Sequence, residues 1–169
     1  MSGAQRLRVV LLVWKPQVPD DPMDVTHGWP DVLQVQLARD HTVWEPPGVV
    51  VRPGEQLVEA AARVAGALGL TSPKARRVLA VDEYPADGDA PAEVILLLDG
   101  GWCTDADVID VPECLCAHER DCAHRRRWAT AEQACEADAA LTAGLGAAVG
   151  ATPAFVIERK EECRGWGEG

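Results

Sequence analysis

Strand-like stretches outnumber helical ones along this chain, and they are not each followed by a helix. Seven stretches have the alternating or β-branched composition of strands, and they lie within residues 7–14, 31–40, 43–55, 75–84, 92–99, 125–130 and 153–158. Helical spacing is confined to residues 56–69 and 131–149. This order favours an α+β fold with helices packed on a mixed β-sheet over a doubly wound parallel sheet.

Residues 1–169 are expected to form a single domain, because the length fits one core and no linker or internal repeat divides the chain. Hydrophobic residues make up 47% of the sequence, which is enough for a buried core. Three segments are predicted to lie outside that core: a Pro-rich loop at 15–30, a Cys/His-rich insertion at 110–124 and a polar tail at 159–169.

The chain is strongly acidic, with 27 acidic against 16 basic residues and a formal net charge of −11. This charge argues against a nucleic-acid polymer or an anionic membrane as partner. No apolar run reaches the roughly 18 residues of a membrane span, and residues 7–14 fit a strand better than a signal peptide. We therefore expect a cytoplasmic protein with a small-molecule ligand, and the sequence leaves a homodimer open.

Residues 46–70, PPGVVVRPGEQLVEAAARVAGALGL, begin like a phosphate-handling loop that leads into a helix. Four apolar residues recur on one face of this helix, namely Leu57, Ala61, Val64 and Leu68. Gly69 is well suited to end it. Clustered carboxylates would be expected on such a helix, and this face has none.

The order of elements and this stretch resemble the Nudix hydrolase family, whose signature is G-x5-E-x7-R-E-U-x-E-E-x-G-U, with U a bulky aliphatic residue. Glu55 stands at the first glutamate and Arg63 at the arginine. Gly48 matches the glycine that usually precedes the signature, while Val49 replaces the signature's own glycine. The segments RPGE, VILLLDGG, RRRWATAEQ and AFVIE are also similar to the family. The resemblance covers most of residues 6–158 and implies an α/β/α sandwich.

The chain departs from this signature where the family has its catalytic carboxylates. The three glutamates that follow the arginine are replaced by Val64, Ala67 and Leu68. In the family these carboxylates bind divalent cations that activate water for attack on a diphosphate, and Mg²⁺ requires oxygen ligands. We therefore expect no Mg²⁺ at this helix, loss of the usual hydrolase activity, and a role for the three apolar side chains in binding a ligand.

Glu55 and Arg63 are predicted to have a structural role, because in the family this pair braces the loop against the helix. The two residues are eight positions apart, about two helical turns, so they can meet only if the loop folds back over the helix. If any hydrolase activity remains, the substitute carboxylates are Glu55, Glu59 and Glu83.

The stretch ECLCAHERDCAHRRRW, residues 113–128, carries candidate metal ligands at alternate positions: Cys114, Cys116, His118, Cys122 and His124. Alternate residues of an extended segment point the same way, so a hairpin would turn all five toward one space. Zn²⁺ takes four such ligands, and Cys/His mixtures also suit other transition metals. The spacing is not a standard zinc motif, so reduced thiols on an exposed insertion, or a disulfide, stay open as alternatives. In the resembling fold this segment lies near the substrate cleft, which makes the cluster a candidate replacement for the lost metal site.

Two further residues are candidate ligand contacts. Trp44 precedes the Pro/Gly loop, where an aromatic residue in the family can stack on a base, although packing at the sheet edge is an equal alternative. Arg127 shares a strand face with Arg125 and can clamp an anion, although a solvated edge is the alternative.

Three functions are consistent with these residues. The first is a binding or regulatory module for a small ligand, either nucleotide-like or hydrophobic. The second is an enzyme with altered chemistry that uses a transition metal at the Cys/His cluster. The third is a residual hydrolase of nucleoside-diphosphate-linked compounds that uses the substitute carboxylates. The fold alone does not choose among them.

Overall fold

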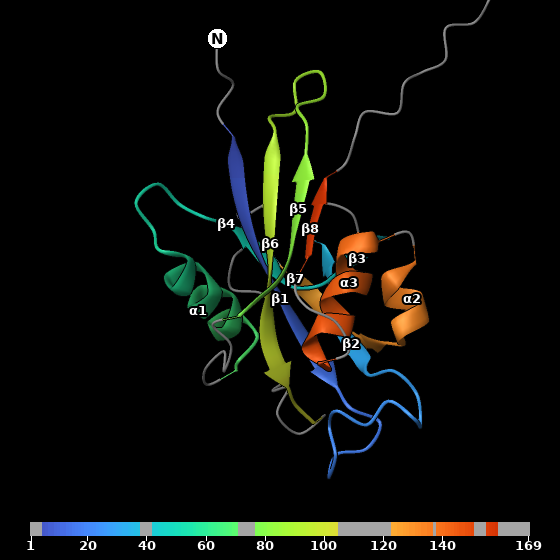
Figure 1. Ribbon diagram of the computed structural model, residues 1–169. Helices are drawn as coiled ribbons and strands as arrows, with labels where there is room; N and C mark the ends of the chain where they lie inside the picture. The colour runs from blue at the N-terminus through green and yellow to red at the C-terminus, as the bar shows by residue number, and fades with distance from the viewer. Residues whose placement is uncertain are drawn as a thin grey trace, which may run out of the picture.

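The computed structural model describes residues 5–37, 42–70, 77–104, 123–136, 138–150 and 155–158 (Figure 1). The strands are β1 (Arg6–Lys15), β2 (Asp31–Leu37), β3 (Trp44–Glu45), β4 (Gly48–Val50), β5 (Val78–Tyr84), β6 (Glu93–Trp102), β7 (Ala123–Ala129) and β8 (Phe155–Glu158). The helices are α1 (Leu57–Ala67), α2 (Ala131–Cys135) and α3 (Ala139–Ala148). None of these helices is long and apolar enough to cross a membrane.

The described strands form one mixed sheet between two helical layers. Its main order is β3-β2-β1-β6-β5-β8, with β4 paired to β1 and β7 paired to β2. The β1–β6 and β5–β8 pairs are parallel, and the others are antiparallel. Figure 1 shows α1 on one face of the sheet and α2 and α3 on the other. The predicted α+β class, with an α/β/α sandwich and a mixed sheet, is therefore confirmed.

Each face of the sheet has its own hydrophobic core, because successive side chains of a strand point to opposite faces. On the α1 face the core includes Val9, Leu11, Val13, Leu33, Val64 and Leu68. On the other face it includes Val10, Leu12, Trp14, Leu97, Leu141 and Leu145. The central strand β1 supplies residues to both cores, which explains its unbroken apolar sequence.

Two elements differ from the sequence prediction. The segment 43–55 contains two short strands, because Pro46 and Pro47 separate β3 from β4 and proline has no N–H to donate to a ladder. The predicted helix at 131–149 is divided into α2 and α3. The second of these begins where Asp138 accepts a hydrogen bond from the backbone N–H of Leu141 at 2.8 Å.

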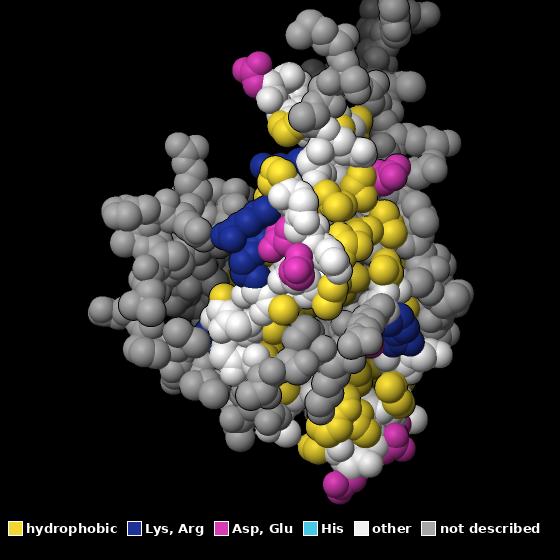
Figure 2. All heavy atoms as spheres, turned by 90° about the vertical axis from the view of Figure 1, so that its left-hand side faces the viewer, with side chains coloured by type: hydrophobic (Ala, Val, Ile, Leu, Met, Phe, Trp, Pro, Cys, Tyr) yellow, Lys and Arg dark blue, Asp and Glu magenta, His cyan; other side chains and the backbone are white. Residues whose placement is uncertain are grey.

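The first helix is capped at both ends, and Gly69 ends it as predicted. Gln56 and Glu59 form a capping box at its start. At its end Gly69 has a positive φ of 72°, a conformation that glycine adopts without a steric penalty. The N–H of Leu70 then donates to the carbonyl of Ala65 at 2.9 Å. Hydrophobic side chains reach the surface on the α1 side of the molecule (Figure 2), among them Leu57 and Val58.

Candidate functional site: the α1 face and the cavity across the sheet

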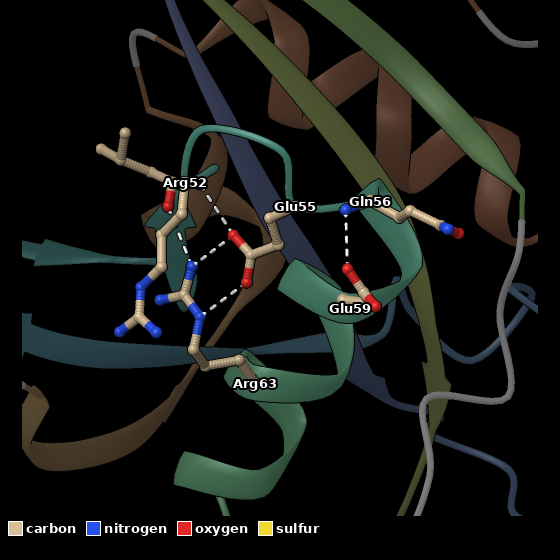
Figure 3. A network of polar contacts seen from close by, with 6 residues as sticks. Arg52, Glu55, Gln56, Glu59 and Arg63 are labelled. Carbon is tan, nitrogen blue, oxygen red and sulfur yellow. Dashed lines mark hydrogen bonds and ion pairs between the residues drawn. The ribbon is translucent and has the colours of Figure 1, made fainter.

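The loop before α1 is braced by the predicted pair of charged residues (Figure 3). Arg63 donates from Nε and Nη2 to the two carboxylate oxygens of Glu55, at 3.0 and 2.9 Å. It also donates to the carbonyl of Val50 at 3.0 Å, and Glu55 accepts from the N–H of Arg52 at 2.8 Å. The loop therefore does fold back over the helix. The hydrogen bonds from Arg63 and then from Arg52 lower the pKa of Glu55 to about 2.

The other two substitute carboxylates are not gathered with Glu55. Glu59 accepts a hydrogen bond from the N–H of Gln56 at 2.8 Å and thereby caps the start of α1. Glu83 is exposed on β5, next to the buried Asp82, and strand alternation places it on the opposite face of the sheet from Asp82. Glu55 and Glu59 thus serve local structure, and any catalytic role for the three residues stays a prediction.

The apolar face of α1 lies in the core. Val64 is 3% exposed and Leu68 is 2% exposed, and both belong to the same cluster as Leu33 of β2. Burial of each side chain stabilises the fold by about 2 kcal/mol. The prediction that Val64 and Leu68 contact a ligand is therefore corrected, because neither offers surface to one. Ala67 is exposed, and its role stays a prediction.

The end of α1 is bound by an arginine from β7. Arg126 donates from Nη1 to the carbonyl of Leu68 at 2.8 Å and from Nη2 to the carbonyl of Ala67 at 3.0 Å. A cation here satisfies carbonyls that have no partner within the helix and interacts favourably with the negative end of the helix dipole. This contact was not predicted from the sequence, because a run of three arginines does not show which of them faces α1.

A cavity of about 620 Å³ lies on the opposite face, between the sheet and the helices α2 and α3. Three groups of residues line it. Strand residues from the centre of the sheet form one group: Arg8, Val10, Asp82, Tyr84, Glu93, Ile95 and Leu97. Residues around the β2 and β3 edge form the second: Gln34, Thr42, Val43, Trp44, Glu45, Pro46 and Arg127. The third comes from the helices: Gln133, Ala134, Glu136, Asp138, Ala140 and Leu141.

The structure brings the two predicted ligand residues Trp44 and Arg127 together at one side of this cavity. The guanidinium carbon of Arg127 lies 4.4 Å from the centre of the Trp44 ring system. Arg127 also donates from Nε and Nη2 to the side-chain oxygen of Gln34, at 3.0 and 2.8 Å. Gln34 is only 4% exposed, so the amide is placed firmly and in turn orients the arginine.

Most of the other polar residues of the cavity were not predicted from the sequence. Gln34 and Asp82 are buried, at 4% and 3% exposure, on strands where apolar residues are usual. Their position along the strand could have identified them. Asp82 lies on the same strand face as Ala80, which belongs to the core, so an apolar residue would be expected at position 82. Arg8 pairs with Glu45 at 2.9 Å and joins β1 to β3 beside the cavity.

Most of the Cys/His cluster lies outside the described residues, namely Cys114, Cys116, His118 and Cys122. His124 is part of β7, but its side chain is not described. Across the described ranges, no group of three or more His, Cys, Asp or Glu side chains is arranged to hold a metal ion. The predicted transition-metal site is therefore untested.

Comparison with solved structures finds similar folds at low sequence identity. A MutT protein from Methanosarcina mazei Go1 aligns with a TM-score of 0.51 and 17% identity, over 77% of this chain and 80% of that protein. The Ap4A hydrolase of C. elegans aligns with a TM-score of 0.52 and 20% identity, over 88% and 98% of the two chains. The Nudix domain of Shewanella oneidensis NrtR, complexed with ADP ribose, gives 0.51 and 15%, over 75% and 73%.

The chain has the Nudix fold. Comparisons with protein-family models and with curated proteins give no match. The identities to the solved structures are low, so the likeness concerns the fold and not the reaction.

The α1 helix of this Nudix fold does not offer the ligands that Mg²⁺ requires. The signature's three glutamate positions carry Val64, Ala67 and Leu68, which have no side-chain oxygen. The side chains of Val64 and Leu68 are buried, and the backbone carbonyls of Ala67 and Leu68 accept hydrogen bonds from Arg126. The residues of this face therefore do not fit a hard divalent cation.

Proposed function

We propose that this Nudix-fold protein binds a small organic ligand in the cavity beside Trp44 and does not hydrolyse diphosphates at α1. The ligand is nucleotide-like or hydrophobic, and the protein acts as a binding or regulatory module. This proposal rests on the difference between the two faces of the β-sheet. One face has a cavity with an oriented aromatic and guanidinium pair, and the other has an α1 helix whose signature positions are apolar.

The cavity has the size and lining of a small-molecule site. Its volume of about 620 Å³ falls within the usual range for such sites, about 300 to 1,000 Å³. Val10, Ile95 and Leu97 provide apolar surface, and Trp44 and Tyr84 provide aromatic surface. The buried Gln34 fixes Arg127 against Trp44, so the polar groups on this side are ordered before a ligand arrives.

The α1 face supports the loss of metal-dependent hydrolysis. A Mg²⁺ ion bound to a polyphosphate needs several oxygen ligands in octahedral geometry. Val64 and Leu68 are instead packed in the core, and a charged group in their place would have to be desolvated. The brace between Glu55 and Arg63 is kept, and this is explained by its role in holding the loop.

The direct test is a ligand screen by thermal shift on the wild-type protein and two variants. A ligand that binds only the folded chain raises the melting temperature. For a ligand of the cavity, Trp44→Ala should abolish the shift, while Ala67→Glu on the exposed part of α1 should leave it unchanged. The proposal fails if ligands of the wild-type protein shift the Trp44→Ala variant equally.

Two alternatives are tested by separate measurements. An enzyme that uses Cys114, Cys116, His118, Cys122 or His124 would carry zinc, copper or iron at near-stoichiometric levels, which elemental analysis of the purified protein measures. A residual hydrolase would turn over nucleoside diphosphate compounds with Mg²⁺ or Mn²⁺ and lose activity in Glu55→Gln. A cytoplasmic location is also part of the proposal, and fractionation of the source cells tests it.

A further inference from the structure

The side chain of Gln34 can offer a ligand of the cavity hydrogen-bond donors but no acceptor. It comes from β2, lines the cavity and is only 4% exposed. Its oxygen Oε1 accepts hydrogen bonds from both Nε and Nη2 of Arg127, at 3.0 and 2.8 Å. An amide oxygen has two lone pairs, so both are used. The part of the amide that remains for a ligand is the nitrogen Nε2, with its two N–H groups.

The neighbouring arginine determines which way round this amide lies. The oxygen and nitrogen of a glutamine have nearly the same shape, so their positions are assigned from their partners. A guanidinium has donors only, and it can therefore bind the oxygen of Gln34 but not the nitrogen. Arg127 is itself held in place, because it pairs with Gln34 across the β2–β7 ladder and lies 4.4 Å from the centre of the Trp44 ring system. The amide is therefore oriented before a ligand arrives.

The nitrogen of Gln34 has no acceptor within the described part of the chain. The two bonds from Arg127 to the oxygen are the only hydrogen bonds of this side chain there. Among the described residues, the single fully enclosed side-chain nitrogen or oxygen without a partner is Nε1 of Trp14, so Nε2 of Gln34 is not sealed in the core. It therefore reaches the space that Gln34 lines. A donor so deeply placed is normally satisfied by water or by a ligand.

The charges of the lining favour a neutral ligand. Carboxyl groups outnumber guanidinium groups there, so an anion would meet repulsion. A cation gains little from these carboxyl groups, because most of them already have partners in the protein. Glu45 is bound by Arg8, Glu93 by Arg6, and Asp138 by the backbone N–H of Leu141. The free donors of Gln34 are therefore best matched by an uncharged acceptor, and the commonest of these in organic ligands is a carbonyl oxygen.

We propose that Gln34 determines the specificity of this cavity by donating a hydrogen bond from Nε2 to a carbonyl oxygen of a neutral organic ligand. This inference rests on the proposed function, since it names the chemistry that the same cavity recognises. Val10, Ile95 and Leu97 supply apolar surface for the rest of the ligand. A ligand of the same shape without an acceptor would displace water from Nε2 and leave the donor unsatisfied, so it should bind more weakly.

The test uses three probes of one shape. Acetophenone has a carbonyl oxygen, α-methylstyrene has a CH₂ group in its place, and benzoate has a carboxylate. NMR titration of the ¹⁵N-labelled protein at constant ionic strength should show acetophenone binding about tenfold more tightly than α-methylstyrene, with benzoate weaker than acetophenone. The side-chain N–H resonances of Gln34 should move downfield with acetophenone and not with α-methylstyrene, a change that a purely structural role would not produce.

Two matched variants assign the preference to one residue. Gln34→Glu keeps the oxygen that faces Arg127 and replaces the donor Nε2 by an acceptor, so the preference for acetophenone over α-methylstyrene should be lost. Gln133→Glu makes the same exchange at another lining residue and should keep the preference. It also keeps the capping box of α2, where glutamate serves as well as glutamine. If Gln34→Glu fails to fold, the Gln34 resonances of the wild type decide the question.

The outcomes separate this inference from the proposed function. If α-methylstyrene or benzoate binds as tightly as acetophenone and Trp44→Ala abolishes that binding, the cavity is a ligand site but Gln34 does not select a neutral carbonyl group. The same conclusion follows if Gln34→Glu keeps the preference. If no probe binds at millimolar concentration, the inference about Gln34 is contradicted, while the wider thermal-shift screen still judges the cavity. Binding that does not depend on Trp44 contradicts both.

Discussion

The guanidinium of Arg126 donates a 2.8 Å hydrogen bond to the carbonyl oxygen of Leu68, at the end of α1. The next residue along β7, Arg127, faces the cavity on the other side of the sheet. Two consecutive arginines therefore serve two different faces, because strand side chains alternate. Arg126 stabilises the end of α1, and Arg127 lies against Trp44 at one side of the cavity.

Replacing these arginines separately should separate stability from binding. Arg126→Gln removes two charge-assisted hydrogen bonds to the end of α1 and should lower the free energy of unfolding by about 1 to 3 kcal/mol. Urea denaturation measures this change. Arg127→Gln, on the same strand, leaves the end of α1 unchanged and should alter ligand binding. Equal stability of Arg126→Gln and the wild type would contradict the assigned role of Arg126.

Restoring glutamates to α1 should damage the fold and not create a metal site. Val64→Glu and Leu68→Glu each place a carboxylate at a position less than 4% exposed, and we expect a loss of about 3 kcal/mol or more in the free energy of unfolding. Ala67→Glu is exposed and should change stability by no more than about 0.5 kcal/mol. A Leu68→Glu variant that is as stable as the wild type and binds Mg²⁺ stoichiometrically would show that this face is not a fixed part of the core.

The brace between Glu55 and Arg63 should make stability depend on acid pH. The folded pKa of Glu55 is about 2, below the ordinary glutamate value of about 4.3. The carboxylate therefore stabilises the fold above the unfolded pKa, and this contribution is lost as the pH falls toward the folded value. The wild type should be more stable than Glu55→Gln at pH 7, and the difference should shrink as the pH falls below about 4.5.

The partner residue provides the control for this pH effect. Arg63 is the largest cause of the lowered pKa of Glu55, so in an Arg63→Gln background the pH-dependent part of the difference should be much smaller. NMR titration of the Glu55 side chain in the wild type measures the pKa directly. A pKa near 4 would contradict the geometry of the brace.

Much of the architecture could be predicted from the sequence because its signals are local. The apolar run of β1 and the helical spacing of α1 identify both elements, and Gly69 ends the helix as expected. The division of 131–149 into α2 and α3 was missed, because an alanine-rich stretch keeps helical propensity throughout and Asp138 is the only capping signal at the break.

The site was harder to predict, because a helical face is apolar both when it binds a hydrophobic ligand and when it packs in a core. Spacing placed Val64 and Leu68 on one face correctly, but only the packing against β2 shows that this face is buried. Trp44 and Arg127 were selected separately, and their contact depends on the pairing of β2 with β3 and β7, which a single sequence does not reveal. Gln34 and Asp82 could have been noticed because each is a polar residue at a strand position where the alternation predicts a buried apolar one.

Incubation with ADP ribose and Ap4A in the presence of Mg²⁺ or Mn²⁺, followed by phosphorus NMR, tests whether the protein hydrolyses diphosphates. These two compounds are named with the solved structures that share the fold. We expect both compounds to remain intact at protein concentrations where a Nudix hydrolase consumes them completely. Metal-dependent cleavage that is lost in Glu55→Gln or Glu59→Gln, while those variants stay folded, would contradict it.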